Sequence, residues 1–143
     1  GPRAALWRLR EGHSEAINTL GAPHKLDVTL PAAAMAHFLA TVPEVIAEVD
    51  PTARAWLFGH AADGNIHVNI TGVDADDERT DEAVLRHVAS LGGRISAEHG
   101  IGTAKRAMLH LNRSPAELAV FRALKAALDP SGTLNPMVLI PPA

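Results

Sequence analysis

Two histidines, His60 and His67, lie on either side of an Asp63-Gly64 pair within residues 58–70. Asp-Gly between two alternating runs predicts a β-hairpin with a two-residue type I′ turn, because that turn needs positive φ at both central residues. With the turn at Asp63-Gly64, His60 lies directly opposite His67 on one face, and directly opposed Cβ atoms are about 4.5–5.5 Å apart. Such a pair could share one metal ion.

The same register predicts that the opposite face of the hairpin is apolar. It pairs Leu57 with Ile70, Gly59 with Val68, and Ala61 with Ile66. Asn69 lies two residues past His67 and therefore joins the histidine face. A slip of one residue would mix the two faces, so the agreement supports the register. From geometry alone the histidines are either metal ligands or ordinary polar residues of an exposed hairpin face.

A second segment, residues 96–105, places Glu98 beside His99 and follows them with Gly100 and Gly102. Glycines let the backbone turn sharply and approach a ligand closely. Glu98 could complete a set of two histidines and one carboxylate, and three protein ligands with an open position are typical of a catalytic metal site. His99 could be a general base, since imidazole exchanges protons near neutral pH. The alternative is a surface Glu-His pair in a tight turn.

The elements that must position these residues follow from the hydrophobic pattern. We expect helices over residues 6–20, 32–49, 76–91, 103–111 and 115–128, strands over 26–30, 53–58, 65–71 and 94–98, and an extended tail over 129–143. Pro43 predicts a kink or a break in the second helix. The order β-α-β-β-α-β, followed by C-terminal helices, predicts an α+β fold with a ferredoxin-like antiparallel sheet and helices on one face.

Composition sets limits on the class of protein. A length of 143 residues with 47% hydrophobic residues is sufficient for one domain with its own core. The net charge is -3 and basic residues form no block, so we expect no nucleic-acid binding. There is no cysteine, which excludes disulfides and thiolate ligands. No apolar run approaches 18 residues, and we expect a soluble, cytoplasmic protein.

Five motifs occur in order along the chain. They are Trp-x-x-Arg-Glu at residues 7–11, Lys-x-Asp-Val at 25–28, Gly-His-x-x-Asp-Gly-Asn-x-His at 59–67, Ala-Glu-His-Gly-x-Gly at 97–102 and Leu-Asp-Pro-x-Gly-x-x-Asn-Pro at 128–136. Together they resemble the C-terminal domain of the FAD-linked oxidases, in the vanillyl-alcohol-oxidase superfamily. Its members include D-2-hydroxyglutarate dehydrogenase, D-lactate dehydrogenase and glycolate oxidase. Three positions depart from the family pattern: His13, Ala62, which replaces a glycine, and Met137.

The resemblance implies roles for individual residues. It implies that His60, His67 and Glu98 bind a divalent metal, zinc in some members and manganese or iron in others. It implies that His99 is the catalytic base that takes the hydroxyl proton. The residues in substrate-binding positions are Arg10, Ser14, Lys25 and Asn69. Asn135, in the last motif, is the candidate for a contact with the cofactor.

The implied activity is FAD-dependent oxidation of a D-2-hydroxy acid to the 2-oxo acid. Asn69 and the Ser96-Ala97 pair resemble the 2-hydroxyglutarate branch more than the lactate and glycolate branches. Because the chain starts at Gly1-Pro2 without methionine, we expect residues 1–143 to be one domain of a longer protein, inactive without its FAD-binding domain. Expected partners are that domain, an electron acceptor (a quinone, a cytochrome or an electron-transfer flavoprotein) and a second copy in a homodimer. The expected location is cytoplasmic or peripheral at the inner membrane, and mitochondrial in a eukaryote.

Two other functions use the same residues. One is a mononuclear metal enzyme that needs no flavin, with the two histidines and the carboxylate as its ligands. The other is a ferredoxin-like binding module without catalytic activity. Binding of a divalent metal would separate the second from the enzymes, and a requirement for flavin would separate the two enzymes.

Overall fold

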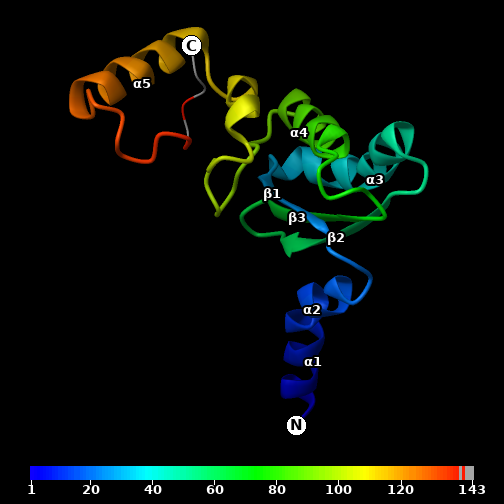
Figure 1. The fold of residues 1–143 in the computed structure, drawn as a ribbon. Helices are drawn as coiled ribbons and strands as arrows, with labels where there is room; N and C mark the ends of the chain where they lie inside the picture. The colour runs from blue at the N-terminus through cyan, green and yellow to red at the C-terminus, as the bar shows by residue number, and fades with distance from the viewer. Residues whose placement is uncertain (139, 141–143) are drawn as a thin grey trace.

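A computed structural model of the chain describes residues 1–138 and residue 140. In chain order its elements are α1 (Pro2–Glu11), α2 (His13–Asn18), β1 (His24–Thr29), α3 (Ala32–Val49), β2 (Arg54–His60), β3 (Asn65–Thr71), α4 (Arg79–Ser90), the 3-10 helix η1 (Arg106–Leu111) and α5 (Pro115–Leu128). Figure 1 shows α3 and α4 against one side of a small sheet, with α1, α2 and α5 outside this central layer. The predicted α+β class is confirmed.

The sheet has three antiparallel-paired strands in the order β1-β3-β2. β3 is central, and its Ile66, Val68 and Ile70 are buried beneath the helices. From α3, Phe38 and Val42 are fully buried in the same core. Burying such side chains stabilises a fold by about 1.5–3 kcal/mol each. One face of the sheet is therefore closed by the core, and the other face is available for polar side chains.

The hairpin register differs from the predicted one by two residues. His67 lies opposite Phe58 and His60 lies opposite Asn65, so the strands are joined by a four-residue loop and not by a two-residue turn. The predicted turn fails because Gly64 has positive φ (74°) while Asp63 is not among the described residues that do. A shift of two residues keeps every side chain on its face, since the strand repeat is two. His60, His67 and Asn69 still share the polar face.

Three other expectations need correction. The strand predicted over residues 94–98 is reduced, among the described residues, to one antiparallel bridge between Thr29 and Arg94. The first predicted helix divides into α1 and α2 at Gly12. The helix predicted over residues 103–111 is the shorter η1. The break that Pro43 could cause in the second predicted helix is also absent, because α3 runs through Pro43 as one helix.

α3 is apolar enough to be compared with a membrane span. Its 18 residues have a mean hydropathy of 1.3, which meets the length and composition of such a span. Glu44 and Glu48 interrupt the apolar residues, however, and Phe38, Val42 and Ile46 are buried in the core. These contacts make α3 a core helix of the domain, together with α4.

Gly64 fixes the end of the hairpin loop. Its carbonyl oxygen accepts a hydrogen bond from the Leu30 N–H (2.9 Å), and a Cβ added at Gly64 would collide with the Leu30 carbonyl oxygen. We expect Gly64→Ala to lower the free energy of unfolding by about 1–3 kcal/mol, because it combines a positive φ with a backbone collision. Urea denaturation measures the change. Ala62→Gly, in the same loop, is the control; an equal loss in both variants would contradict this account.

The lowered pKa of Asp129, the residue that follows α5, leads us to expect that stability depends on pH. A hydrogen bond from Lys125 Nζ, with others from the N–H groups of Leu134 and Thr133, lowers the pKa of Asp129 from 3.8 to about 2. Because the pKa of Asp129 is lower in the folded protein, its carboxylate stabilises the fold at pH values above the unfolded-state pKa of 3.8. This stabilisation is lost as the pH falls through the folded-state pKa of about 2. The urea midpoint of wild type should exceed that of Asp129→Asn at pH 5, and the two should converge near pH 2. A constant difference would contradict the assignment.

Candidate metal centre

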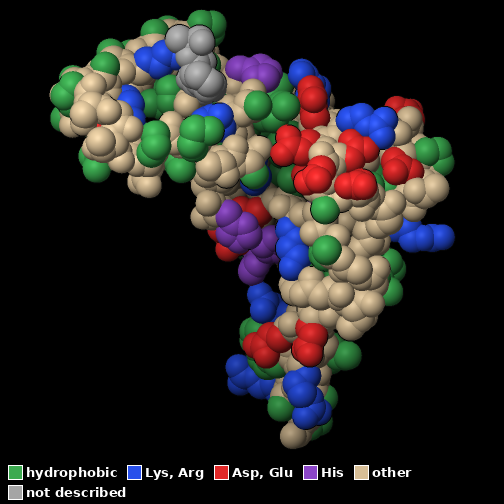
Figure 2. Space-filling model, viewed as in Figure 1, with side chains coloured by type: hydrophobic (Ala, Val, Ile, Leu, Met, Phe, Trp, Pro, Cys, Tyr) green, Lys and Arg blue, Asp and Glu red, His purple; other side chains and the backbone are tan. Residues whose placement is uncertain are grey.

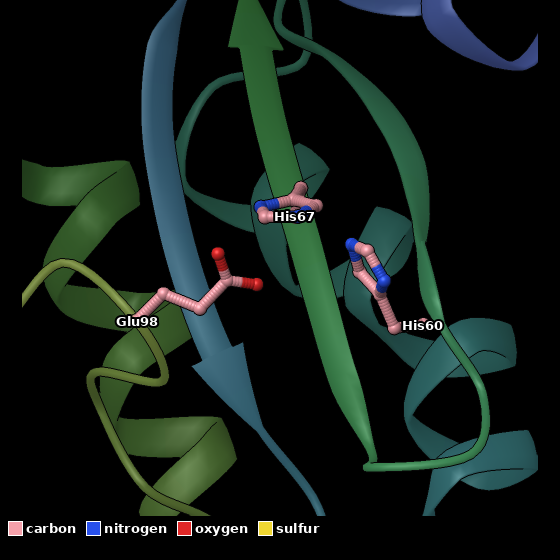
Figure 3. Close-up of side chains that lie close together, drawn as sticks. All are labelled: His60, His67 and Glu98. Atoms are coloured by element: carbon pink, nitrogen blue, oxygen red, sulfur yellow. The ribbon is translucent and has the colours of Figure 1, made fainter.

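The polar face of the sheet brings together the three predicted metal ligands. Ligand atoms of His60, His67 and Glu98 all lie within 4.8 Å of one another. The two imidazole rings are edge to face, with centroids 5.6 Å apart. Figure 3 shows His60 on β2, His67 on β3 and Glu98 on the loop that follows α4, with their polar ends directed toward one another. The histidines are half-buried and Glu98 is exposed, so the centre opens to solvent on one side.

Register explains why two histidines separated by a four-residue loop still meet. His60 is opposite Asn65, and His67 is the next residue beyond Asn65 on the same face. Such diagonal neighbours in a sheet are within reach of long and aromatic side chains. The prediction of direct opposition is wrong, but the prediction of a shared face and of proximity is confirmed.

Asn65 is a functional candidate that the sequence interpretation missed. Its side chain is 2% exposed, and its Nδ2 donates a hydrogen bond to Glu98 Oε1. This contact fixes one carboxylate oxygen of Glu98, the third candidate ligand, relative to the strand that bears His67. The available signal was positional: Asn65 lies two residues before His67 and therefore on its face.

Asp27 on β1 is the second candidate that was missed. It is directly opposite His67 in the β1–β3 ladder and is 1% exposed. Its Oδ2 accepts backbone N–H hydrogen bonds from Ala97 (3.2 Å), Glu98 (2.6 Å) and His99 (3.1 Å). This one oxygen therefore holds the loop that supplies both Glu98 and His99. The Lys-x-Asp-Val motif contains Asp27, but nothing in the sequence shows which backbone it would meet.

The Asp27 carboxyl remains ionised despite its burial. Burial acts to raise its pKa, but hydrogen bonds from the Glu98 and His99 N–H groups, with the nearby charges of His99 and Lys105, outweigh that effect and lower the pKa below 3.8. Lys105 is 8% exposed and its Nζ donates to the Asp27 carbonyl oxygen (3.0 Å). Burial is also the largest influence on Lys105, whose pKa is lowered. A buried, compensated charge thus lies directly beneath the candidate centre.

His99, the predicted base, lies beside the candidate metal ligands. Its ring centroid is 6.3 Å from that of His67, and the two rings are stacked. Its Nδ1 is 3.9 Å from Asp27 Oδ2, and its side chain is 66% exposed. The imidazole therefore borders the open side of the centre, where a substrate would enter. Its role as base stays a prediction.

The predicted substrate-binding residues fall into two groups. Arg10 and Ser14, at the α1–α2 junction, line a hollow together with His60. Lys25 and Asn69 are opposite each other in the β1–β3 ladder, on the face that bears His67. Arg10 and Ser14 thus share a hollow with His60, and Lys25 and Asn69 share the sheet face of His67. Asn135, the predicted cofactor contact, has positive φ (45°) and lies in the segment after α5, which Figure 1 shows apart from the sheet.

The residues present fit a divalent metal. Two imidazoles and a carboxylate are a donor set that zinc, manganese and iron accept, and with three protein ligands a position stays open for substrate. The buried carboxylate of Asp27 fits as well, because its Oδ1 has no hydrogen-bond partner among the described residues and lies 3.6 Å from His67 Nδ1. Histidines that bind metals commonly donate their other ring N–H to a carboxylate.

The comparison with known families agrees with this geometry. The family model described as "FAD linked oxidases, C-terminal domain" matches residues 2–139. The chain belongs to this family. The residues of the candidate cluster, Asp27 and Asn65 all lie within the region that matches the FAD-linked oxidase C-terminal domain.

Several curated relatives of this FAD-linked oxidase domain are named D-2-hydroxyglutarate dehydrogenase. The chain is 38% identical over 139 residues to the D-2-hydroxyglutarate dehydrogenase of Stutzerimonas stutzeri (strain A1501), which covers 92% of the chain and 30% of that protein. It is 40% identical over 141 residues to the enzyme of the same name from Xanthomonas citri pv. viticola, and the match covers 93% of the chain and 30% of that protein. It is 33% identical to the mitochondrial enzyme of the same name from Arabidopsis thaliana, and the match covers 96% of the chain and 25% of that protein. The chain thus spans less than a third of the length of these relatives.

The Asn65–Glu98 hydrogen bond generates a prediction. Asn65→Asp would place a second carboxylate against Glu98, so repulsion replaces a hydrogen bond to a charged group. We expect the metal-free protein to lose about 1–2 kcal/mol of unfolding free energy, measured by urea denaturation with a chelator present. Unchanged stability would mean that the Asn65–Glu98 contact is absent in solution.

Proposed function

We propose that the chain is the substrate- and metal-binding domain of an FAD-dependent dehydrogenase that oxidises a D-2-hydroxy acid to the 2-oxo acid. The single observation that supports this most directly is the convergence of His60, His67 and Glu98, with His99 beside them, on the open face of the sheet. The name D-2-hydroxyglutarate dehydrogenase shared by the relatives favours 2-hydroxyglutarate over lactate or glycolate.

In this proposal the residues of the chain bind the acid and handle its proton. His99 accepts the proton of the substrate hydroxyl, for which its exposed position at the rim is suited. The guanidinium of Arg10 bonds two oxygens of a carboxylate at once, whereas the ammonium of Lys25 acts as a point charge. Ser14 and Asn69 add polar contacts from the two sides of the cluster. Together these contacts orient the Cα–H bond for transfer.

Two cofactors complete the proposed chemistry. A divalent metal held by His60, His67 and Glu98, with zinc as first choice, supplies a Lewis acid that acidifies the hydroxyl group. FAD, bound by a separate domain, supplies the acceptor for the hydride. An electron acceptor such as a quinone, a cytochrome or an electron-transfer flavoprotein is then needed to reoxidise the flavin.

Exposed apolar surface supports a contact with a flavin-binding domain. On α1, Leu6 and Leu9 are 68% and 70% exposed, and at the end of α5 Leu128 is 79% exposed. Figure 2 shows hydrophobic side chains gathered over the α5 region. Exposed apolar side chains that gather in a patch mark contact surfaces. Since relatives are at least three times as long, the flavin domain is the proposed occupant of these surfaces.

For location, the names of the plant and bovine relatives include the word mitochondrial. We propose a mitochondrial location if this chain is eukaryotic and a cytoplasmic one if it is bacterial. Attachment to the inner membrane and a homodimer belong to the same proposal.

The test uses the complete flavoprotein and dye reduction with D-2-hydroxyglutarate and with D-lactate. We expect one zinc per chain, and a kcat/KM at least about tenfold higher for the dicarboxylate, which one added charged contact provides. His60→Ala should remove the metal and lower turnover by about 100-fold or more, because it deletes a ligand. Elemental analysis and steady-state kinetics measure both effects.

His110→Ala is the matched control, since His110 is an exposed histidine on η1 whose Nδ1 contacts only the local Ala107 carbonyl oxygen among the bonds described. It should retain metal and activity. Turnover without flavin would support the flavin-independent metal enzyme instead. Absence of bound metal, with His60→Ala fully active, would refute the proposed centre.

A further inference from the structure

We propose that Asp27 is the positioning residue of the centre: its carboxylate fixes the ring orientation of His67 and holds the backbone of Glu98 and His99 in place. This inference rests on the proposed function for its consequence, the arrangement of ligands and base. The contacts that support it all lie within this chain.

The loop contacts alone do not explain a charged group at this position. The N–H groups of Ala97, Glu98 and His99 all bond to one oxygen, Oδ2. A neutral amide oxygen could accept the same hydrogen bonds, at a lower cost of burial. The other oxygen, Oδ1, is buried and without a hydrogen-bond partner among the described residues. An unpaired buried polar atom is unfavourable, so such an atom calls for a specific explanation.

His67 Nδ1 supplies that explanation. It lies 3.6 Å from Asp27 Oδ1, and the two residues are direct partners in the β1–β3 ladder. An ionised carboxylate only accepts hydrogen bonds, so it selects the imidazole tautomer with the proton on Nδ1. Nε2 is then unprotonated, and its lone pair is available for a metal.

The same carboxylate links the ligand to the base. Glu98 and His99 receive their backbone positions from Oδ2, and His99 Nδ1 lies 3.9 Å from that oxygen. The Asp27 main chain is held in turn by Lys105 Nζ, which donates to its carbonyl oxygen. One buried residue therefore connects the strand that faces His67 with the loop that bears Glu98 and His99.

The test is Asp27→Asn in the complete protein labelled with ¹⁵N-histidine, free of metal and at a pH where the ring is neutral. In wild type we expect the proton of His67 on Nδ1. In the variant we expect the amide oxygen of Asn to accept the loop hydrogen bonds, so that its NH₂ faces His67. Because an NH₂ group donates a hydrogen bond, Nδ1 of His67 must then accept it, and the ring proton moves to Nε2. Nitrogen chemical shifts report the tautomer, and His67→Gln assigns the signals. A role confined to loop structure would leave the tautomer unchanged.

Cobalt(II) binding, followed by its visible spectrum, is the second readout. Loss of a carboxylate behind a ligating histidine weakens metal binding by about 10- to 100-fold, and we expect Asp27→Asn to do so. Asp81→Asn is the matched control, because Asp81 also bonds a histidine on β1, His24 (3.0 Å), away from the cluster. It should leave the His67 tautomer and the cobalt affinity unchanged.

The outcomes separate the two proposals. Wild-type His67 with its proton on Nε2 overturns the role of Asp27, whether or not the variant folds. An unchanged tautomer together with a cobalt dissociation constant within twofold of wild type in Asp27→Asn overturns it as well, while the metal centre stands. The expected tautomer switch in a protein that binds no cobalt supports the role of Asp27 and refutes the metal centre.

Discussion

The structure depends on one constraint, which is that one face of β3 is apolar and the other face is polar. Ile66, Val68 and Ile70 point into the core beneath α3 and α4, while His67 and Asn69 point to the other side. Because successive side chains of a strand alternate, the hydrophobic contacts that fold the domain also decide which residues face the site. The site requires no separate folding element for its histidines.

This constraint explains what could be predicted from the sequence. The alternation over residues 65–71 predicts β3 and its polar face correctly, and that face survives a register error of two residues because two is the repeat of the strand. The exact pairing was not predictable from Asp63-Gly64 alone. Gly64 is fixed by Leu30 of a preceding segment, a long-range contact that outweighs the local preference for a two-residue turn.

Long-range contacts also account for the absent fourth strand and for the two buried polar residues that were missed. Residues 94–98 were predicted as a strand, yet the N–H groups of Ala97 and Glu98 bond to the Asp27 carboxylate and not to a neighbouring strand. Asp27 and Asn65 were missed for the same reason, since a buried polar residue shows its purpose only through partners distant in the chain. The three candidate ligands, in contrast, were recognisable because His60, His67 and Glu98 stand in sequence motifs that resemble those of the FAD-linked oxidases.

The central claim is that His60, His67 and Glu98 bind one metal ion. The most direct test is a crystal structure of the complete protein with anomalous diffraction recorded on both sides of the zinc absorption edge. The account predicts one anomalous peak per chain, about 2.0–2.2 Å from a nitrogen of each histidine and from a Glu98 carboxylate oxygen. An active protein with no peak at this position, or with its metal bound by other residues, would contradict it.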